Sequence, residues 1–266
     1  MFPEIFQSKY FTLNTLWVFF ALAIFAGAYT LIKLTVKNGL KVQFINEHSW
    51  GLLISALLGA RLFALIQHAN TYFYEFSKDT FLQIFYIWDK GLNAYGAIAA
   101  ILIYLFYITK KHEQDFYKWL DILIPSLIIG LAIGHLGSFF EGINYGRETG
   151  LPWGVNFESP SIKYTVPIHP TQIYAFLYSI ALGIGLIGLS KTEKFKDLTK
   201  PGLIGLIGVT AYFSLQFLEQ FVRGDDTITF FSIRLPQIGY LILAILSGII
   251  IFLRYNKRTK KRKRSN

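Results

Sequence analysis

Five side chains that can bind a ligand or move a proton lie close together in the stretch GHLGSFFEGINYGRETGLPWGV, residues 134–155: His135, Ser138, Glu141, Asn144 and Arg147. The stretch closes the apolar run DILIPSLIIGLAIG, which is typical of the interior of a membrane span. A span that simply ended in water would not need this arrangement. We therefore expect these residues to hold a ligand where the span ends.

Two further segments carry more polar side chains than helix capping requires. IHPTQIYAFLYS, residues 168–179, contains Pro170, which suits a first helical turn, and Thr171 or His169 can satisfy free amides there. That accounts for only part of a set that comprises His169, Gln172 and Tyr174. AYFSLQFLEQFVRGDD, residues 211–226, carries a stripe at helical spacings of three and four, made of Gln216, Glu219, Gln220 and Arg223. Such a stripe on an apolar span faces protein or a water-filled cavity.

Arg61 and Tyr95 are two more candidates in or beside apolar runs. Arg61, in LLGARLFAL, lies near the middle of its run and needs an acceptor, water or a lipid phosphate, because arginine stays charged. Pairing with a carboxylate such as Asp121 is the structural alternative. Tyr95, in WDKGLNAYGAIAA at residues 88–100, is either a site residue or an aromatic at the membrane surface.

Apolar runs long enough to cross a bilayer carry these segments. The chain has 266 residues, of which 53% are hydrophobic and 16% charged, and its mean hydropathy is +0.42. A spanning helix needs about 20 mostly apolar residues. Seven runs qualify: 12–33, 49–68, 92–109, 119–140, 168–190, 201–222 and 234–254. The sequence predicts an all-α polytopic membrane protein with one seven-span domain, residues 1–254, and a basic tail, residues 255–266.

Lysines and arginines are distributed unevenly between the loops. Of the 26, 18 fall in the tail, in the loops after spans 1, 3 and 5 or at the span ends that border them; seven fall on the opposite side, and Arg61 lies within span 2. The positive-inside rule then places the N-terminus outside and the C-terminus in the cytoplasm. The tail is expected to bind anionic lipid headgroups rather than nucleic acid. All the polar segments at span ends then lie near the outer face, which suits an amphiphilic ligand with its phosphate on arginine and its tails between helices.

Other chemistries have weaker support. A chain with no cysteine has no Cys-ligated metal site and no Cys nucleophile, and five scattered histidines give no metal signature. A serine hydrolase built on His135 and Ser138 lacks a third carboxylate and a nucleophile elbow. A transporter is disfavoured because inverted repeats are missing.

Several co-linear motifs resemble those of a known family. GARLF, WDKGLNAYGA, WLDILIP, IHPTQIY, FVRGDD and RLPQIG, together with residues 134–155, are similar in order and type to the motifs of the prolipoprotein diacylglyceryl transferases. The resemblance implies transfer of the diacylglyceryl group of phosphatidylglycerol to the lipobox cysteine thiol of lipoprotein precursors, at the outer face of the bacterial inner membrane. It implies seven spans with the N-terminus outside, and we expect no cofactor.

This chain departs from the family's motifs at positions that carry chemistry. In the signature G-R-x-G-N-F-x-N-x-E, the arginine, the two asparagines and the glutamate are replaced by His135, Ser138, Glu141 and Ile143. Tyr95 stands at an essential histidine of the family. In span 6 the tyrosine is kept as Tyr212, whereas an arginine and a glutamate are replaced by Gln216 and Gln220. Ala175 replaces a further glutamate, and the Gly146–Arg147 pair is kept.

The implied reaction needs a base for a thiol, whose free pKa is about 8.5, and cations for the phosphate that leaves. We expect catalytic roles for His135, Tyr95, Glu141, His169 and Tyr212. We expect the substrate to be bound by Arg61, Ser138, Asn144, Gly146, Arg147, Gln172, Tyr174, Gln216, Gln220 and Arg223.

Two alternatives stay open beside this transferase. The first is a catalytically diverged relative that keeps the fold and binds phospholipid or lipoproteins without thiol transfer, which the substituted positions motivate. The second is transfer of a lipid group to a non-thiol acceptor.

Overall fold

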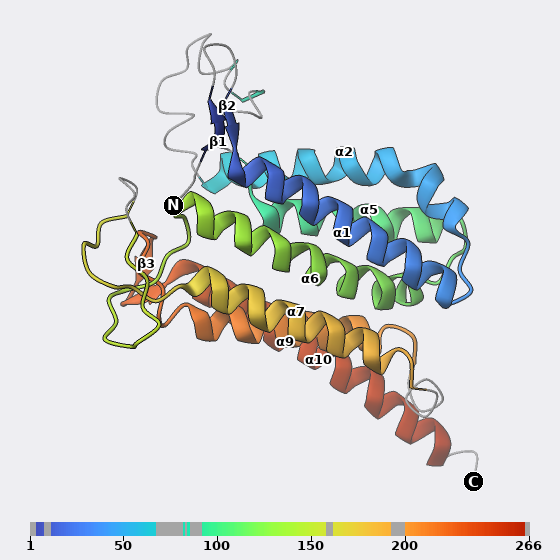
Figure 1. Ribbon diagram of the computed structural model, residues 1–266. Helices are drawn as coiled ribbons and strands as arrows, with labels where there is room; N and C mark the ends of the chain where they lie inside the picture. Colours follow the sequence, from blue (N-terminus) through green and yellow to red (C-terminus); the bar gives the residue numbers. More distant parts are fainter. Residues whose placement is uncertain are drawn as a thin grey trace. The chain divides into compact units, whose positions relative to one another are not determined.

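Seven long helices make up most of the computed structural model, which describes residues 4–7, 12–67, 82, 84–85, 92–157, 162–192 and 200–263 (Figure 1). The helices are α1 (Thr15–Lys37), α2 (Val42–Gln67), α5 (Ala94–Lys111), α6 (Phe116–Glu141), α7 (Thr171–Leu189), α9 (Leu203–Glu219) and α10 (Leu235–Lys263). Six of them are long and apolar enough to cross a membrane, and α9, with 17 residues, is the shorter seventh. The predicted all-α, multi-pass membrane architecture is confirmed.

Two of the boundaries that differ from the predicted runs lie near the ends of the chain. Residues 12–14 were predicted to open the first span, but they form strand β2 (Thr12–Asn14), which pairs antiparallel with β1 (Glu4–Gln7), and the helix begins at Thr15. At the other end, α10 does not stop before the basic tail but continues to Lys263. Lysine and arginine have high helix propensity, so the tail can extend the helix that precedes it.

The chain divides into two compact units, residues 38–116 and residues 1–37 together with 117–266. In the unit of residues 38–116, α2 packs against α5. Gly59 and Gly96 lie at this contact, and a Cβ at Gly96 would overlap the carbonyl oxygen of Gly59. The side chain of Asn93 caps α5 by accepting hydrogen bonds from the backbone of Tyr95 at 2.9 Å and of Gly96 at 3.3 Å. The prediction of a single domain over residues 1–254 stays a prediction.

In the larger unit, α6 is the most buried helix, with Trp119, Ile122 and Ala132 almost inaccessible. Helix α1 approaches α6 at glycines: a Cβ at Gly130 would lie 2.9 Å from the carbonyl oxygen of Ala23. Small residues at a helix crossing permit this close backbone approach.

Helix α9 packs against both α7 and α10 (Figure 1). Asp121 on α6 determines where α9 begins, since its carboxylate accepts hydrogen bonds from the backbone N–H groups of Gly202 at 2.6 Å and Gly205 at 2.8 Å. A carboxylate at a helix N-terminus satisfies orphan donors and complements the helix dipole. This contact sets the register of α9 against α6.

Candidate functional site

Three chain segments of the larger unit are joined by backbone hydrogen bonds near the ends of α6, α7 and α9. The N–H of Gly146 donates to the carbonyl of His169 at 3.1 Å, and the N–H of Arg147 donates to the carbonyl of Val222 at 2.8 Å. The N–H of Gly224 donates to the carbonyl of Tyr145 at 2.9 Å. The segments after α6, before α7 and after α9 are therefore held at fixed positions, and each carries predicted site residues.

Gly146 is required by this close approach. A Cβ at that position would overlap the carbonyl oxygen and the Cβ of His169 and would lie 3.0 Å from the carbonyl oxygen of Val222. A small core supports the same segments, with buried residues Tyr145, Phe157, Ile162 and Ile168. The loop after α6 is thus packed, and its polar side chains project from a fixed backbone.

His135 and Tyr212 form the first polar contact between α6 and α9. The Nε2 atom of His135 lies 3.3 Å from the Tyr212 hydroxyl, and Nε2 of Gln216 donates to that same hydroxyl at 3.1 Å. Because the Gln216 amide nitrogen can only donate, the hydroxyl hydrogen of Tyr212 is free to point at His135. The arrangement gives a hydrogen-bonded chain that runs from Gln216 through Tyr212 to His135.

A second chain of contacts centres on Arg223. Its guanidinium donates to Glu219 Oε1 at 3.3 Å, to Asn144 Oδ1 at 2.8 Å and to both oxygens of Asp225 at 2.7 Å each. Glu219 also accepts from the hydroxyl of Tyr178 at 2.8 Å. The side chain of Arg223 is 11% exposed, so it joins α9 to the loop after α6 as an internal cation. Burial tends to lower the pKa of Arg223, but Asp225 and Glu219 outweigh it and raise that pKa.

The predicted polar stripe of α9 faces protein, as expected. Gln216, Glu219 and Gln220 are 2%, 7% and 2% exposed. Gln220 accepts a hydrogen bond from Nε of Arg234 at 2.8 Å. Arg234 ends the hairpin of β3 (Thr229–Phe230) and β4 (Ile233–Arg234), just before α10.

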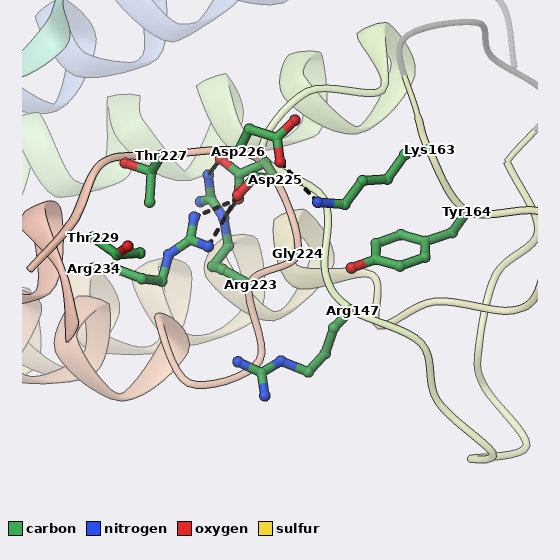
Figure 2. Close-up of a pocket in the computed structure, with 10 residues that line it drawn as sticks. All are labelled: Arg147, Lys163, Tyr164, Arg223, Gly224, Asp225, Asp226, Thr227, Thr229 and Arg234. Carbon is green, nitrogen blue, oxygen red and sulfur yellow. Dashed lines mark hydrogen bonds and ion pairs between the residues drawn. The ribbon is translucent and has the colours of Figure 1, made fainter. Parts of the chain in front are cut away.

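Arg234 and Asp225 are site residues that the sequence reasoning did not select. Nη2 of Arg234 donates to Asp225 Oδ1 at 2.9 Å, so that this one carboxylate contacts two arginines. A cavity of about 420 Å³ opens beside them and is also lined by Arg147 (Figure 2). The sequence signal was available in FVRGDD, where two carboxylates directly follow an arginine, but the partner of Asp225 lies in a separate hairpin.

His169, Tyr174 and Trp153 form a third group. The indole Nε1 of Trp153 donates to the Tyr174 hydroxyl at 2.8 Å, and that hydroxyl lies 3.2 Å from Nδ1 of His169. Because indole only donates, the Tyr174 hydrogen is free to point at Nδ1, and in that arrangement neutral His169 carries its ring hydrogen on Nε2. Burial lowers the pKa of His169, and the positive charge of Arg147 lowers it further. His169 is therefore neutral near pH 7 and presents an N–H donor.

Side chains at the start of α7 form hydrogen bonds to the loop after α6 and do not cap α7. Pro170 is the N-cap residue and no side chain caps the helix, so the prediction that Thr171 or His169 satisfies free amides there is wrong. The Thr171 hydroxyl donates instead to the carbonyl of Asn144 at 2.7 Å, and Gln172 donates to the carbonyl of Ile143 at 2.8 Å. These carbonyls belong to an irregular loop and need donors from outside it.

Two polar side chains at the end of α6, Ser138 and Glu141, differ in whether their polar atoms have hydrogen-bond partners. Ser138 donates to the carbonyl of Gly134 at 3.4 Å and accepts from Asn144 at 3.4 Å. It is not hydrogen-bonded to His135, whose Nε2 faces Tyr212, so the serine hydrolase alternative has no geometric support among the described residues. Glu141 has one buried oxygen, Oε2, without a hydrogen-bond partner in the described part of the chain.

The remaining predicted residues, Arg61 and Tyr95, belong to the unit of residues 38–116. Arg61 is 6% exposed and its Nε donates to the carbonyl of Ile84 at 2.9 Å. The alternative partner Asp121 has its carboxylate at the start of α9. The roles of Arg61 and Tyr95 stay predictions, and residues 88–91 of the Tyr95 motif lie outside the described residues.

Comparison with known proteins gives similarities that extend over nearly the whole chain. A family model described as prolipoprotein diacylglyceryl transferase matches residues 3–254. Similar proteins named phosphatidylglycerol–prolipoprotein diacylglyceryl transferase occur in Finegoldia magna, with 30% identity over 94% of this chain and 95% of the relative, and in Tropheryma whipplei, with 27% identity over 96% and 95%. One from Thermosynechococcus vestitus is 27% identical over 92% of this chain and 90% of the relative.

Proposed function

The chain belongs to the prolipoprotein diacylglyceryl transferase family, and we propose that it transfers the diacylglyceryl group of phosphatidylglycerol to the lipobox cysteine of lipoprotein precursors. It is a multi-pass membrane transferase. We place it in the bacterial inner membrane with its active side facing the outer leaflet, because the uneven distribution of lysine and arginine puts the loops that carry the site outside.

The observation that carries this function is the His135–Tyr212 contact beside a cluster of arginines in one unit. In the transfer, a bond forms between the thiol sulfur and the glycerol carbon that bears the phosphate. The bond from this carbon to the phosphate oxygen breaks, its electron pair stays on the oxygen, and glycerol phosphate leaves. The thiol proton must go to a base on the protein.

His135 is the base that the hydrogen bonds favour. In the tautomer whose Nε2 accepts from Tyr212, a thiol that donates to the Tyr212 oxygen can pass its proton to His135 through the hydroxyl. His169 suits a different role, since Tyr174 occupies its Nδ1 and leaves Nε2–H to donate to a phosphate oxygen. Glu141, with its buried unpaired oxygen, is the remaining proton acceptor among the predicted catalytic residues.

Phosphate binding is assigned to cations of the loops. Arg147 is the most available, because its side chain is exposed and has no ion-pair partner within the described ranges. Arg223 is engaged by four hydrogen bonds and acts mainly by positioning Asn144 and Asp225. Lys and Arg residues of the tail are proposed to bind anionic headgroups on the cytoplasmic side.

One observation favours the second candidate, a relative that binds phospholipid without transfer. Gln216 stands where the family resemblance implies an arginine, and its amide is buried and hydrogen-bonded to Tyr212. A neutral side chain there stabilises the leaving phosphate less than a guanidinium does. The transferase requires that another cation supply this charge.

The test is incubation of the purified protein with phosphatidylglycerol and a lipobox peptide, followed by mass spectrometry of the peptide. The proposed function predicts a gain of one diacylglyceryl mass on the cysteine peptide and none on a Cys-to-Ser peptide, with the gain lost in His135→Ala. A serine adduct would point to a non-thiol acceptor. A folded protein that retains phosphatidylglycerol but forms no adduct on either peptide would establish the binding relative.

A further inference from the structure

The cavity beside Arg147 and Arg234 has a lining unlike that of a lipid-tail site. The described residues that form its walls are charged residues, threonines, a glycine and one tyrosine, and none of them has an aliphatic side chain (Figure 2). Acyl chains require apolar walls, since burying polar groups without hydrogen bonds costs free energy. The cavity, about 420 Å³ in volume, therefore suits a small polar ligand.

The charges around the cavity do not balance. Four cations line it, Arg147, Lys163, Arg223 and Arg234, against two carboxylates, Asp225 and Asp226. Lys163 pairs with Asp226 at 2.8 Å, while Arg223 and Arg234 share Asp225. With Glu219 counted on Arg223, one positive charge is left among the described residues, that of Arg147. The surplus positive charge predicts an anionic ligand.

Arg234 is held so that part of its guanidinium stays available. It donates through Nε to Gln220, through Nη1 to the carbonyl of Asp225 at 2.9 Å and through Nη2 to the Asp225 carboxylate. A guanidinium has five N–H groups, so two N–H groups remain, one on each terminal nitrogen. Burial lowers the pKa of Arg234, and the positive charges of Arg223 and Arg147 act in the same direction against the opposing effect of Asp225.

We propose that this cavity binds an alkyl phosphate, with Arg147 as the direct cation and Arg234, oriented by Asp225 and Gln220, as the second. The ligand is the glycerophosphate group, either within a phospholipid headgroup or as the glycerol phosphate that the transfer releases. The choice of glycerol rests on the proposed function. Arg234 then supplies, from the hairpin before α10, a cation that α9 lacks at Gln216.

Charge explains why the released form would bind well. The headgroup phosphate is a diester with one negative charge, and cleavage of one ester bond converts it into a monoester whose charge at pH 7 is about −1.5 to −2. Guanidinium groups bind phosphate oxygens through charge-assisted hydrogen bonds that strengthen with this charge. The cavity thereby stabilises the leaving group more than the intact lipid.

The experiment measures binding of glycerol phosphate to the full-length protein in phosphatidylcholine nanodiscs by isothermal titration calorimetry. Glycerol serves as a probe that lacks the charged phosphate, and inorganic phosphate serves as a probe that lacks the alkyl group. We expect Arg147→Gln and Arg234→Gln each to weaken binding of glycerol phosphate at least tenfold. The matched control is Lys191→Gln, an exposed lysine at the end of α7, which should bind as the wild type does. Wild-type affinity in Arg147→Gln, whose side chain is exposed and has no ion-pair partner among the described residues, would overturn the proposal.

Two further measurements are needed. One distinguishes a lipid headgroup from released glycerol phosphate as the ligand, and the other distinguishes failure of the binding site from failure of the transferase. If phosphatidylglycerol in the nanodisc displaces glycerol phosphate, the headgroup shares the cavity; if it does not, the cavity takes the released product. Both results support an alkyl phosphate site. Arginine-dependent binding in a protein that forms no peptide adduct would retain the site and reject the transferase. Transfer without any binding of glycerol phosphate would retain the transferase and reject the site.

Discussion

The hydroxyl of Tyr212 lies 3.3 Å from Nε2 of His135, although the two residues are 77 positions apart and stand on different helices. The contact requires α9 to lie at one register against α6, and Asp121 sets that register at the other end by capping α9. A structural carboxylate at one end of the helix pair thus positions the proton-transfer groups at the opposite end.

Replacing His135 by Gln should lower the rate of transfer by about 10²- to 10⁴-fold, the usual contribution of a general base. If the proton passes through the hydroxyl, Tyr212→Phe should also lower the rate by at least about tenfold, because a phenyl ring has no proton to relay. The measurement is kcat by mass spectrometry of the lipobox peptide. The control is Tyr117→Phe, a substitution on the same helix as His135. A wild-type kcat in Tyr212→Phe would mean that His135 acts without Tyr212.

His169 should titrate at a lower pH than an ordinary histidine, whose pKa is about 6.5. Burial lowers its pKa first and the charge of Arg147 second, so Arg147→Gln should raise the pKa by removing the second cause. NMR of histidine-labelled protein in micelles measures both midpoints. An unchanged midpoint in Arg147→Gln would exclude an electrostatic effect of Arg147 on His169.

The same shift has a consequence for stability. Since the folded state holds His169 with a lowered pKa, it binds fewer protons there than the unfolded chain does. The contribution of His169 to stability is therefore complete above the unfolded pKa of about 6.5 and falls as the pH drops through the lowered folded pKa. Thermal unfolding of wild type and His169→Phe should differ more at pH 7.5 than at pH 5, and a constant difference would contradict this sign.

Asp225→Asn should destabilise the site, because it removes the carboxylate that Arg223 and Arg234 share. Removing one partner of a buried ion pair costs about 3–5 kcal/mol, and partial exposure here reduces the expected loss to about 2–3 kcal/mol. The measurement is the melting temperature in detergent. Asp226→Asn provides the control, since its side chain is 89% exposed and pairs with Lys163 at the surface. Equal melting temperatures for both variants would rule out a special role for Asp225.

Gly146→Ala should lower the melting temperature and the transfer activity, whereas Gly150→Ala should not. A Cβ at Gly146 overlaps the backbone of His169, whereas a Cβ at Gly150 has no atom within 4 Å in the described structure. Overpacking of this kind costs about 1–3 kcal/mol and would move His169 away from Arg147. We expect a lower melting temperature and at least about a tenfold loss of transfer in Gly146→Ala alone. If both alanine variants behave alike, the three segments are not held as tightly as the hydrogen bonds indicate.

Local sequence patterns were sufficient to predict the spans and part of the site. A run of about 20 apolar residues has to be a helix in a bilayer, because every backbone polar group must be satisfied within the segment. The stripe of Gln216, Glu219 and Gln220 was predictable in the same way, since helical spacing places these residues on one face. Strand β2 was missed because its three residues continue an apolar run, and only pairing with β1 takes them out of the helix.

Contacts between distant segments were not predictable. The sequence places Arg234 only among the charges on the outer side, yet a hairpin brings it to Gln220 and Asp225. Thr171 was expected to cap its own helix, but the loop after α6 offers it the carbonyl of Asn144. Which partner a side chain takes depends on segments far away in the sequence.

Apolar runs were enough to predict the multi-pass helical architecture, and the co-linear motifs were enough to predict the family. The sequence also predicted that polar side chains gather at the ends of particular helices, because spacing and hydropathy are local properties. Three features of the site became visible only in the folded chain: His135 faces Tyr212, Asp225 binds two arginines, and Arg147 lacks an ion-pair partner among the described residues. Hydrogen bonds and ion pairs form only within a few ångströms, and folding alone brings residues so far apart in the chain to that distance.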